Sequence, residues 1–315
     1  MKKRFFRFTT LWVVFTLLIT SLLACKPSAP DPTPTPGDSG QPSGSPQASQ
    51  TPEASPTPTP TPTQQVTPIP TPEPTPSPAP TELKLKFGSY NLGNGEYVKH
   101  DFSVLANDIK DKDLDIVGLQ EVDVRVPRSG NKNSIRLLSE ASGLRYYAFF
   151  KAINIGPFGE YGVAVLSKYP IVSTDSTLLP SATYEQRVLG HAVIDVDGTQ
   201  INFFVSHLSY ENDEVRKEQF AKINEVVNQY DDFVLAADFN TTQFQEYTAI
   251  QGSDMVNNAK RFLVTFPSSK SSIDNIVFSK SCWTFGKAET LTLNHSDHYM
   301  LFAEGTFQIP SEKQK

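Results

Sequence analysis

Residues 113–124 read DLDIVGLQEVDV and contain a strand whose pattern is typical of the sheets predicted for this chain. Ile116 to Leu119 form an unbroken run of apolar residues and glycine, which is typical of a strand buried on both faces. The run stops at Gln120-Glu121, so the strand presents a carboxylate at its end. A buried strand that ends in an ionisable side chain predicts a packed sheet with a functional site at its edge.

Further strands are predicted on both sides of this one. Leu83, Leu85 and Phe87 alternate with polar residues or glycine, which indicates a half-buried strand that ends at Tyr90-Asn91. Asp197-Gly198 is typical of a two-residue hairpin turn. The remaining strands are predicted at 146–150, 162–166, 188–196, 200–206, 233–237, 273–278 and 299–307.

Three helices are predicted between these strands, at residues 101–112, 133–142 and 212–229. Asp101 is a candidate N-cap of the first helix, and Gly143 stands where a glycine commonly ends a helix. About nine strands with few helices, joined by hairpins and helical crossovers, predict an α+β fold. We expect two sheets packed face to face with helices on the outside.

The first 25 residues have the features of an export signal. Four basic residues precede an apolar stretch from Leu11 to Leu23, which is short for a membrane span. Leu22-Leu23-Ala24-Cys25 resembles the lipobox of bacterial lipoproteins, and this resemblance implies cleavage before Cys25 and lipidation of that cysteine. A plain signal peptide and an uncleaved anchor are the alternatives. We therefore predict lipid anchoring to the cell membrane, facing outside the cytoplasm.

Residues 26–82 are rich in proline, threonine and serine. They hold 19 of the 25 prolines of the chain and no aromatic residue. Such a segment cannot bury enough apolar surface to offset a backbone ordering cost of roughly 1–2 kcal/mol per residue, so a disordered stalk is predicted. Residues 83–315 remain for one catalytic domain. Its single cysteine, Cys282, has no partner for a disulfide and is expected to be a small buried residue.

The net charge of −6 belongs entirely to the domain, because residues 1–82 carry five basic and five acidic residues. This acidic balance argues against a protein held on nucleic acid by its overall charge. It still allows an enzyme that contacts phosphate groups locally. We expect the domain to be a monomer.

Polar and ionisable residues gather at the predicted strand ends. Each one alone is explained equally well as a turn former or a solvated side chain. Together, their carboxylates suit a hard divalent cation such as Mg²⁺, and a nearby histidine suits proton transfer. These residues are Asn91, Glu121, His207, Asp238, Asn240, Asp274, Asp297 and His298.

Seven short blocks resemble, in their order and spacing, the endonuclease/exonuclease/phosphatase superfamily. The resemblance covers residues 83–308 and implies a deoxyribonuclease-like four-layer sandwich, with two mixed β-sheets face to face and helices outside. Ala237 departs from the family pattern, in which glycine usually precedes the aspartate. The blocks are Ser89-Tyr90-Asn91, Leu119-Gln120-Glu121-Val122-Asp123, Gly159-Glu160-Tyr161-Gly162, Ser206-His207-Leu208, Ala237-Asp238-Phe239-Asn240, Ser272-Ile273-Asp274 and His295-Ser296-Asp297-His298.

The resemblance also implies roles for single residues around a scissile phosphate. Glu121 with Asn91, supplemented by Asp297, would hold Mg²⁺ or Mn²⁺ there. His298 would be the general base that activates water, and Asp274 would fix the tautomer of its ring.

Other residues would act on the opposite side of the phosphate. His207 would protonate the leaving oxygen or stabilise its charge, and Glu160 would orient this histidine. Asn240 would donate to a phosphate oxygen and orient Asp238, which supplements the metal site. Three arginines are candidate substrate-phosphate contacts, namely Arg125, Arg128 and Arg187.

The sequence therefore predicts a surface-tethered, metal-dependent phosphoester hydrolase. Phosphodiesters are the expected substrate class, with nucleic acid as the first expectation. A phosphodiesterase for phospholipid or sphingolipid headgroups, or an inositol-phosphate phosphatase, is the alternative, and it would need an exposed apolar loop such as Ile153–Phe158. A non-catalytic binding lipoprotein is the third interpretation, against which the complete set of polar residues argues.

Overall fold

The computed structural model describes residues 81–309, so the predicted signal peptide, Cys25 and nearly all of the stalk lie outside the described residues. Three α-helices and twelve β-strands occur in this part of the chain. The helices are α1 (Phe102–Asp111), α2 (Ser134–Ser142) and α3 (Asp213–Val227). The strands are β1 (Glu82–Asn91), β2 (Ile116–Val124), β3 (Tyr146–Ile155), β4 (Gly159–Ser167), β5 (Ile171–Leu178), β6 (Val188–Val196), β7 (Thr199–His207), β8 (Val234–Asp238), β9 (Ser253–Met255), β10 (Asp274–Ser279), β11 (Trp283–Leu291) and β12 (Met300–Gln308).

The strands form two six-stranded mixed sheets, which confirms the predicted fold class. The first sheet has the order β11-β12-β1-β2-β4-β3, and the second has the order β5-β6-β7-β8-β10-β9. Each sheet has one parallel pair at its centre, β1 with β2 and β7 with β8, while the neighbouring pairs are antiparallel. Parallel strands end at the same edge of a sheet, so both sheets gather strand ends there.

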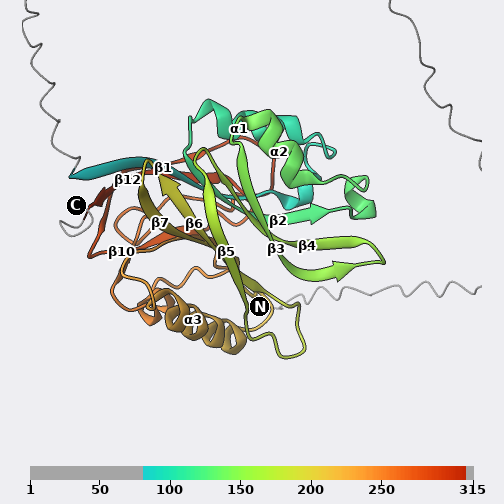
Figure 1. Cartoon of the computed structure of the whole chain (residues 1–315). Coiled ribbons are helices and arrows are strands. Elements are labelled where there is room, and N and C mark those ends of the chain that lie inside the picture. The colour runs from blue at the N-terminus through green and yellow to red at the C-terminus, as the bar shows by residue number, and fades with distance from the viewer. Residues whose placement is uncertain (1–80, 310–315) are drawn as a thin grey trace, which may run out of the picture. The chain divides into compact units, whose positions relative to one another are not determined.

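The sheets face each other across a core in which Phe87 of the first sheet stacks on Phe203 of the second, with ring centroids 5.9 Å apart. Helices α1 and α2 cover the outer face of the first sheet, and α3 covers the second (Figure 1). Gly118 lets the sheets approach closely, because a Cβ at this position would lie 2.8 Å from the Cβ of Ala236.

Each helix begins at a residue that caps it, and the predicted cap of α1 is confirmed. The Asp101 side chain accepts a hydrogen bond from the backbone N–H of Ser103 at the start of α1. Asn133 and Asn212 cap α2 and α3 in the same way. Gly143 ends α2 with a φ of 83°, the left-handed conformation for which glycine is suited.

The sequence missed three strands, β5, β9 and β11, and all three lie at sheet edges. Only one face of an edge strand packs on the protein, and β5 is largely exposed, so no clean apolar alternation marks it. β3 also continues to Ile155 and forms a hairpin with β4, where the sequence predicted a loop. Cys282 is half-buried in the turn before β11. Within the described residues, no helix has the length and apolar character needed to span a membrane.

Candidate active site

A cleft of about 480 Å³ opens at the edge where the central strands of both sheets end. Most of the predicted site residues line it, because their strands deliver them to this edge. Asn91 and Asp274 are buried against these residues and contact them. The lining consists of Glu121, Tyr161, Glu185, Arg187, His207, Tyr210, Glu211, Asp238, Asn240, Phe266, Ile273, Asp297 and His298.

The closest ionisable pair of the cleft joins His298 to Asp274. His298 Nδ1 lies 2.8 Å from Asp274 Oδ2, and both side chains are buried. Burial opposes a charge on the ring, but the carboxylates of Asp274 and Asp238 outweigh it and raise the pKa of His298 to about 10. With Nδ1 engaged by Asp274, Nε2 is the nitrogen of His298 that can accept a proton.

Asp238 connects the two histidines. Its Oδ2 lies 3.5 Å from His207 Nε2 and 3.7 Å from His298 Nε2. The Asn91 amide donates to the same oxygen, and the backbone N–H of Asn240 donates to Oδ1. Burial, and then the neighbouring Asp274 carboxylate, raise the pKa of Asp238.

Glu121 occupies an unusual backbone position in the middle of β2. The pairing of β2 with β4 shifts register between Leu119 and Val122, and Glu121 has a φ of 55° inside this bulge. Its two carboxylate oxygens accept hydrogen bonds from the amides of Asn91 and Asn94, at 3.3 and 2.8 Å. The bulge turns the side chain of Glu121 toward the cleft, as β-bulges beside active sites commonly do.

The residues fit a divalent cation. Burial, together with the nearby Asp297 carboxylate, raises the pKa of Glu121, so two like charges face each other in a poorly solvated place. A hard cation between carboxylates removes this conflict. Asp238, Asp274 and His298 also hold possible ligand atoms within 4.8 Å of one another. We favour Glu121 and Asp297, because Asp274 already engages Nδ1 of His298.

His207 and Arg187 also line the cleft. Burial, and then the nearby Arg187 guanidinium, lower the pKa of His207, so its ring is neutral. Arg187 is almost completely buried and contacts the carboxylates of Glu185 and Glu211, at 3.1 and 3.8 Å. Its Nε is buried and has no hydrogen-bond partner among the described residues.

Three predicted site residues are not where the sequence placed them. Glu160 does not orient His207: it pairs with Arg125 at 3.3 Å and with Lys151 at 3.6 Å, while Nδ1 of His207 has no partner in the described part of the chain. Arg125 is exposed, and neither it nor Arg128 lines the cleft. Glu160 and Arg125 belong to a surface ion pair, which a sequence block cannot distinguish from a catalytic contact.

Sequence reasoning missed several supporting residues. Asn94 holds Glu121 and accepts a hydrogen bond from Arg128, which is itself paired with Asp123. Its signal was an asparagine between two glycines, a combination that favours the left-handed conformation, and Asn94 has a φ of 54°. Thr265 accepts hydrogen bonds from the backbone N–H groups of residues 273 and 274. The run Thr265-Phe266-Pro267 is part of the resemblance to the superfamily, but the resemblance implied no role for this threonine.

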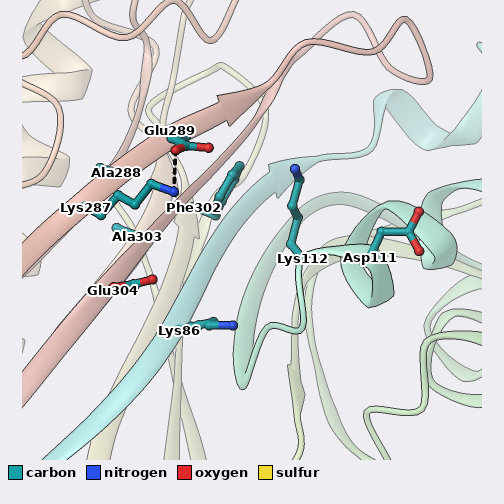
Figure 2. A pocket seen from close by; sticks show the side chains of 9 residues that line it. All are labelled: Lys86, Asp111, Lys112, Lys287, Ala288, Glu289, Phe302, Ala303 and Glu304. Atoms are coloured by element: carbon teal, nitrogen blue, oxygen red, sulfur yellow. Dashed lines mark ion pairs between the residues drawn. The ribbon is translucent and has the colours of Figure 1, made fainter.

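A second, smaller hollow of about 200 Å³ lies on β1, β11 and β12, beside the end of α1 (Figure 2). It contains none of the predicted site residues. Its lysines stand beside acidic groups, with Lys287 Nζ 2.8 Å from Glu289 Oε1, and Lys112 lies over the ring of Phe302. This mixture of paired charges offers no set of converging catalytic groups, so the cleft is the candidate active site.

Known proteins resemble this chain in both sequence and fold. A family model described as the PGAP2IP C-terminal nuclease-like domain matches residues 89–259. Protein cwh43 of Schizosaccharomyces pombe is 35% identical over 102 residues, which is 31% of this chain. The match spans only 10% of that protein.

Three solved structures share the fold. An endonuclease/exonuclease/phosphatase family protein from Bacteroides thetaiotaomicron is 20% identical with a TM-score of 0.57, covering 72% of this chain and 96% of its own. D. rerio TDP2 complexed with a single-strand DNA product is 19% identical with a TM-score of 0.55, covering 70% and 98%. Sphingomyelinase C from Streptomyces griseocarneus is 17% identical with a TM-score of 0.52, covering 70% and 99%.

The family model covers more than half of the chain and includes Asn91, Glu121, His207 and Asp238. The shared fold agrees with the superfamily that the sequence blocks resemble. The chain belongs to the family of the PGAP2IP C-terminal nuclease-like domain, within the endonuclease/exonuclease/phosphatase superfamily.

Proposed function

We propose that the domain is a divalent-metal-dependent phosphoester hydrolase that acts on phosphodiesters. One observation carries the proposal: the hydrogen-bonded pair of Asp274 and His298 lies in the wall of the same cleft as the carboxylates of Glu121 and Asp297. A proton acceptor and a cation site beside one another are what metal-assisted attack by water requires.

Glu121 and Asp297 would hold Mg²⁺ or Mn²⁺. When bound, the cation would neutralise charge on a phosphate oxygen and lower the pKa of the attacking water. Asn91 and Asn94 orient the Glu121 carboxylate, since each donates to one of its oxygens.

His298 would take the proton of the attacking water at Nε2. Asp274 holds Nδ1 at 2.8 Å, which fixes the tautomer and stabilises the imidazolium that forms. The pKa of about 10 shows how strongly the two aspartates favour this imidazolium, and a bound cation would bring the pKa down.

Arg187, His207 and Asn240 would act on the phosphate itself. The neutral ring of His207 can donate a hydrogen bond to an oxygen but carries no surplus proton at neutral pH, so charge stabilisation is its proposed role rather than protonation. Arg187 carries the positive charge and an unused Nε donor. Such donors, placed before the reaction begins, stabilise charge that develops on phosphate oxygens.

Nucleic acid remains one candidate substrate, since the TDP2 structure of this fold holds single-strand DNA. A lipid headgroup phosphodiester is the second, and a specific observation favours it. The lipid alternative needed an exposed apolar loop, and Phe158 is 79% exposed in the turn between β3 and β4. This turn leads into β4, whose residue Tyr161 lines the cleft. The sphingomyelinase C structure shows that this fold accommodates a lipid-degrading enzyme.

Lipid anchoring at Cys25, the stalk at residues 26–82 and a monomeric domain at 83–315 are part of the same proposal. The support for the anchor is the lipobox-like run before Cys25 and the proline-rich sequence directly after it. An enzyme tethered in this way would work outside the cytoplasm.

The proposal is tested by incubating the full-length chain with single-stranded DNA, RNA, sphingomyelin, phosphatidylcholine, inositol phosphates and bis(p-nitrophenyl) phosphate. We expect hydrolysis with Mg²⁺ or Mn²⁺ and none with EDTA. A His298→Ala control prepared in parallel should be slower by about 10²–10⁴-fold. The Glu121→Gln variant should recover part of its activity when Mg²⁺ is raised, as expected for a lost ligand. Equal turnover with and without chelator would contradict the metal-dependent mechanism.

A further inference from the structure

Large apolar side chains are exposed mainly at the cleft end of the domain. We name six of them the apolar rim: Tyr97, Phe158, Leu178, Tyr210, Phe262 and Leu293. Each is at least 41% exposed. At the opposite end of the strands, the comparably exposed side chains are Tyr146, Tyr147 and Val172. Exposed apolar groups that cluster on one surface usually mark an interaction site.

The rim residues are attached to segments that build the cleft. Tyr210 itself lines the cleft, and Phe158 lies in the turn before the β4 residue Tyr161, which also lines it. Leu178 pairs with Val188, the residue that follows Arg187. These three rim residues therefore lie on segments at the end of the domain where the cleft opens.

Tyr97, Phe262 and Leu293 complete this arrangement from three further loops. Tyr97 belongs to the loop after β1, which also carries Asn94. Phe262 belongs to the segment before β10, and Leu293 to the loop after β11 that carries Asp297. None of these loops lies at the far end, where the chain enters β1.

From this arrangement we infer that the apolar rim is a membrane-docking surface, which places the cleft entrance against a lipid bilayer. Tyrosine and phenylalanine rings suit the boundary between headgroups and acyl chains. Leu178 and Leu293 gain by leaving water but cannot stack on nucleic-acid bases as aromatic rings do. The acidic domain and the carboxylate-rich cleft also offer little to a polynucleotide backbone.

The length of the chain before the domain is consistent with a lipid bilayer as the surface on which the rim docks. Residues 26–80 separate the proposed lipid at Cys25 from the first described residue. If fully extended at about 3.1 Å per residue, a proline-rich segment of that length would reach on the order of 170 Å. A lipid at Cys25 would therefore keep the domain within reach of the bilayer, and weak contacts of the rim would form at a raised effective concentration. The inference rests on the proposed function, because docking would serve hydrolysis in the cleft. Its test measures docking alone and involves no catalysis.

The test uses the full-length chain reconstituted into phosphatidylcholine vesicles that contain a shallow doxyl-labelled lipid. Phe158→Trp reports on the rim, and Val172→Trp is the matched control at the far end, because Val172 is 50% exposed. The unsubstituted chain supplies the background from Trp283, because cleavage before Cys25 would remove Trp12. We expect the added fluorescence at position 158 to be quenched several-fold more than that at position 172.

Equal quenching at the two positions, or none at position 158, would overturn the inference. It would also be overturned if single-stranded DNA, and not lipid, shielded the tryptophan at 158, or if the shielding depended on protein concentration and not on vesicles. Hydrogen–deuterium exchange of the 156–159 turn in the unsubstituted chain gives a second measurement, which should slow when vesicles are added. Adding His298→Ala to the Phe158→Trp chain must not alter the quenching, so a failure of the hydrolase proposal would leave this result interpretable.

Discussion

Some residues at the cleft are held in conformations that suit the proposed reaction but lower the stability of the folded state. Glu121 shows this most clearly, because it combines a positive φ of 55° with a half-buried carboxylate near that of Asp297. Each feature raises the free energy of the folded state. Because both features destabilise the fold, Glu121 serves the site and not the packing of β2.

Two substitutions of Glu121 separate the free-energy cost of its positive φ from that of its carboxylate charge. Asparagine tolerates the left-handed conformation better than glutamine does, and both remove the charge. We therefore expect Glu121→Asn to exceed Glu121→Gln in free energy of unfolding by about 1 kcal/mol, while both lose most activity. Urea denaturation without added metal measures the difference. An asparagine variant less stable than the glutamine variant would show that the bulge is not strained.

His298→Ala should lower turnover by about 10²–10⁴-fold, because loss of a general base has this magnitude. Asp274→Asn should cost a similar or smaller factor, since it misplaces the proton on the ring while leaving the cation site intact. Steady-state kinetics on the best substrate measures both. A His298→Ala enzyme that keeps more than about a tenth of the wild-type rate would contradict the assignment of this base.

At the scale of the element, β10 shows how a loop fixes a catalytic group. The Thr265 hydroxyl accepts hydrogen bonds from the N–H groups of Ile273 and Asp274, at 3.1 and 3.0 Å, where β10 begins. Because Asp274 in turn holds His298, a loop residue with no substrate contact determines where the base points.

Thr265→Val keeps the shape of this side chain and removes the acceptor. Two buried N–H groups then lose their partner, so we expect the free energy of unfolding to fall by about 1–3 kcal/mol. Turnover should fall about tenfold as Asp274 shifts, with little change in KM. Thr265→Ser retains the hydroxyl and is the matched control. If Thr265→Val lost stability but kept its full turnover, the role of Thr265 would be structural only.

The whole domain also carries a pH-sensitive group away from the cleft. His191 stacks on Phe204 with ring centroids 4.3 Å apart, and burial lowers its pKa below the ordinary value of about 6.5. The unfolded chain therefore binds a proton more readily than the folded one, so stability is present above pH 6.5 and is lost as the pH falls below that value.

Replacement of His191 by glutamine should flatten this dependence. Urea denaturation at pH 7.5 and pH 5.5 would compare the variant with the wild-type chain, and we expect the variant to lose less stability between the two. An equal loss in both chains would assign the acid sensitivity to other groups.

The domain should also fold without the sequence that precedes it, because both sheets and every cleft residue lie within 83–315. We expect the 83–315 fragment to be monomeric and soluble, with the specific activity of the full-length chain on a soluble phosphodiester. Size-exclusion chromatography and initial rates measure these properties. A fragment that stays soluble only with residues 26–82 attached would show that the stalk contributes to the fold.

The sequence by itself determined the central strands, the helices with their caps, and the chemistry-bearing residues at the strand ends. These follow from local patterns: apolar runs, capping residues and turns need no knowledge of distant contacts. Only the tertiary structure decided which of these residues meet. Glu160 pairs with Arg125 on the surface and not with a site residue. Thr265 and Asn94 support the site through hydrogen bonds to Asp274 and Glu121, and these partners are set by the tertiary fold. Three of the four edge strands, β5, β9 and β11, were missed because an edge strand has a neighbouring strand on one side only, so its sequence pattern is weaker.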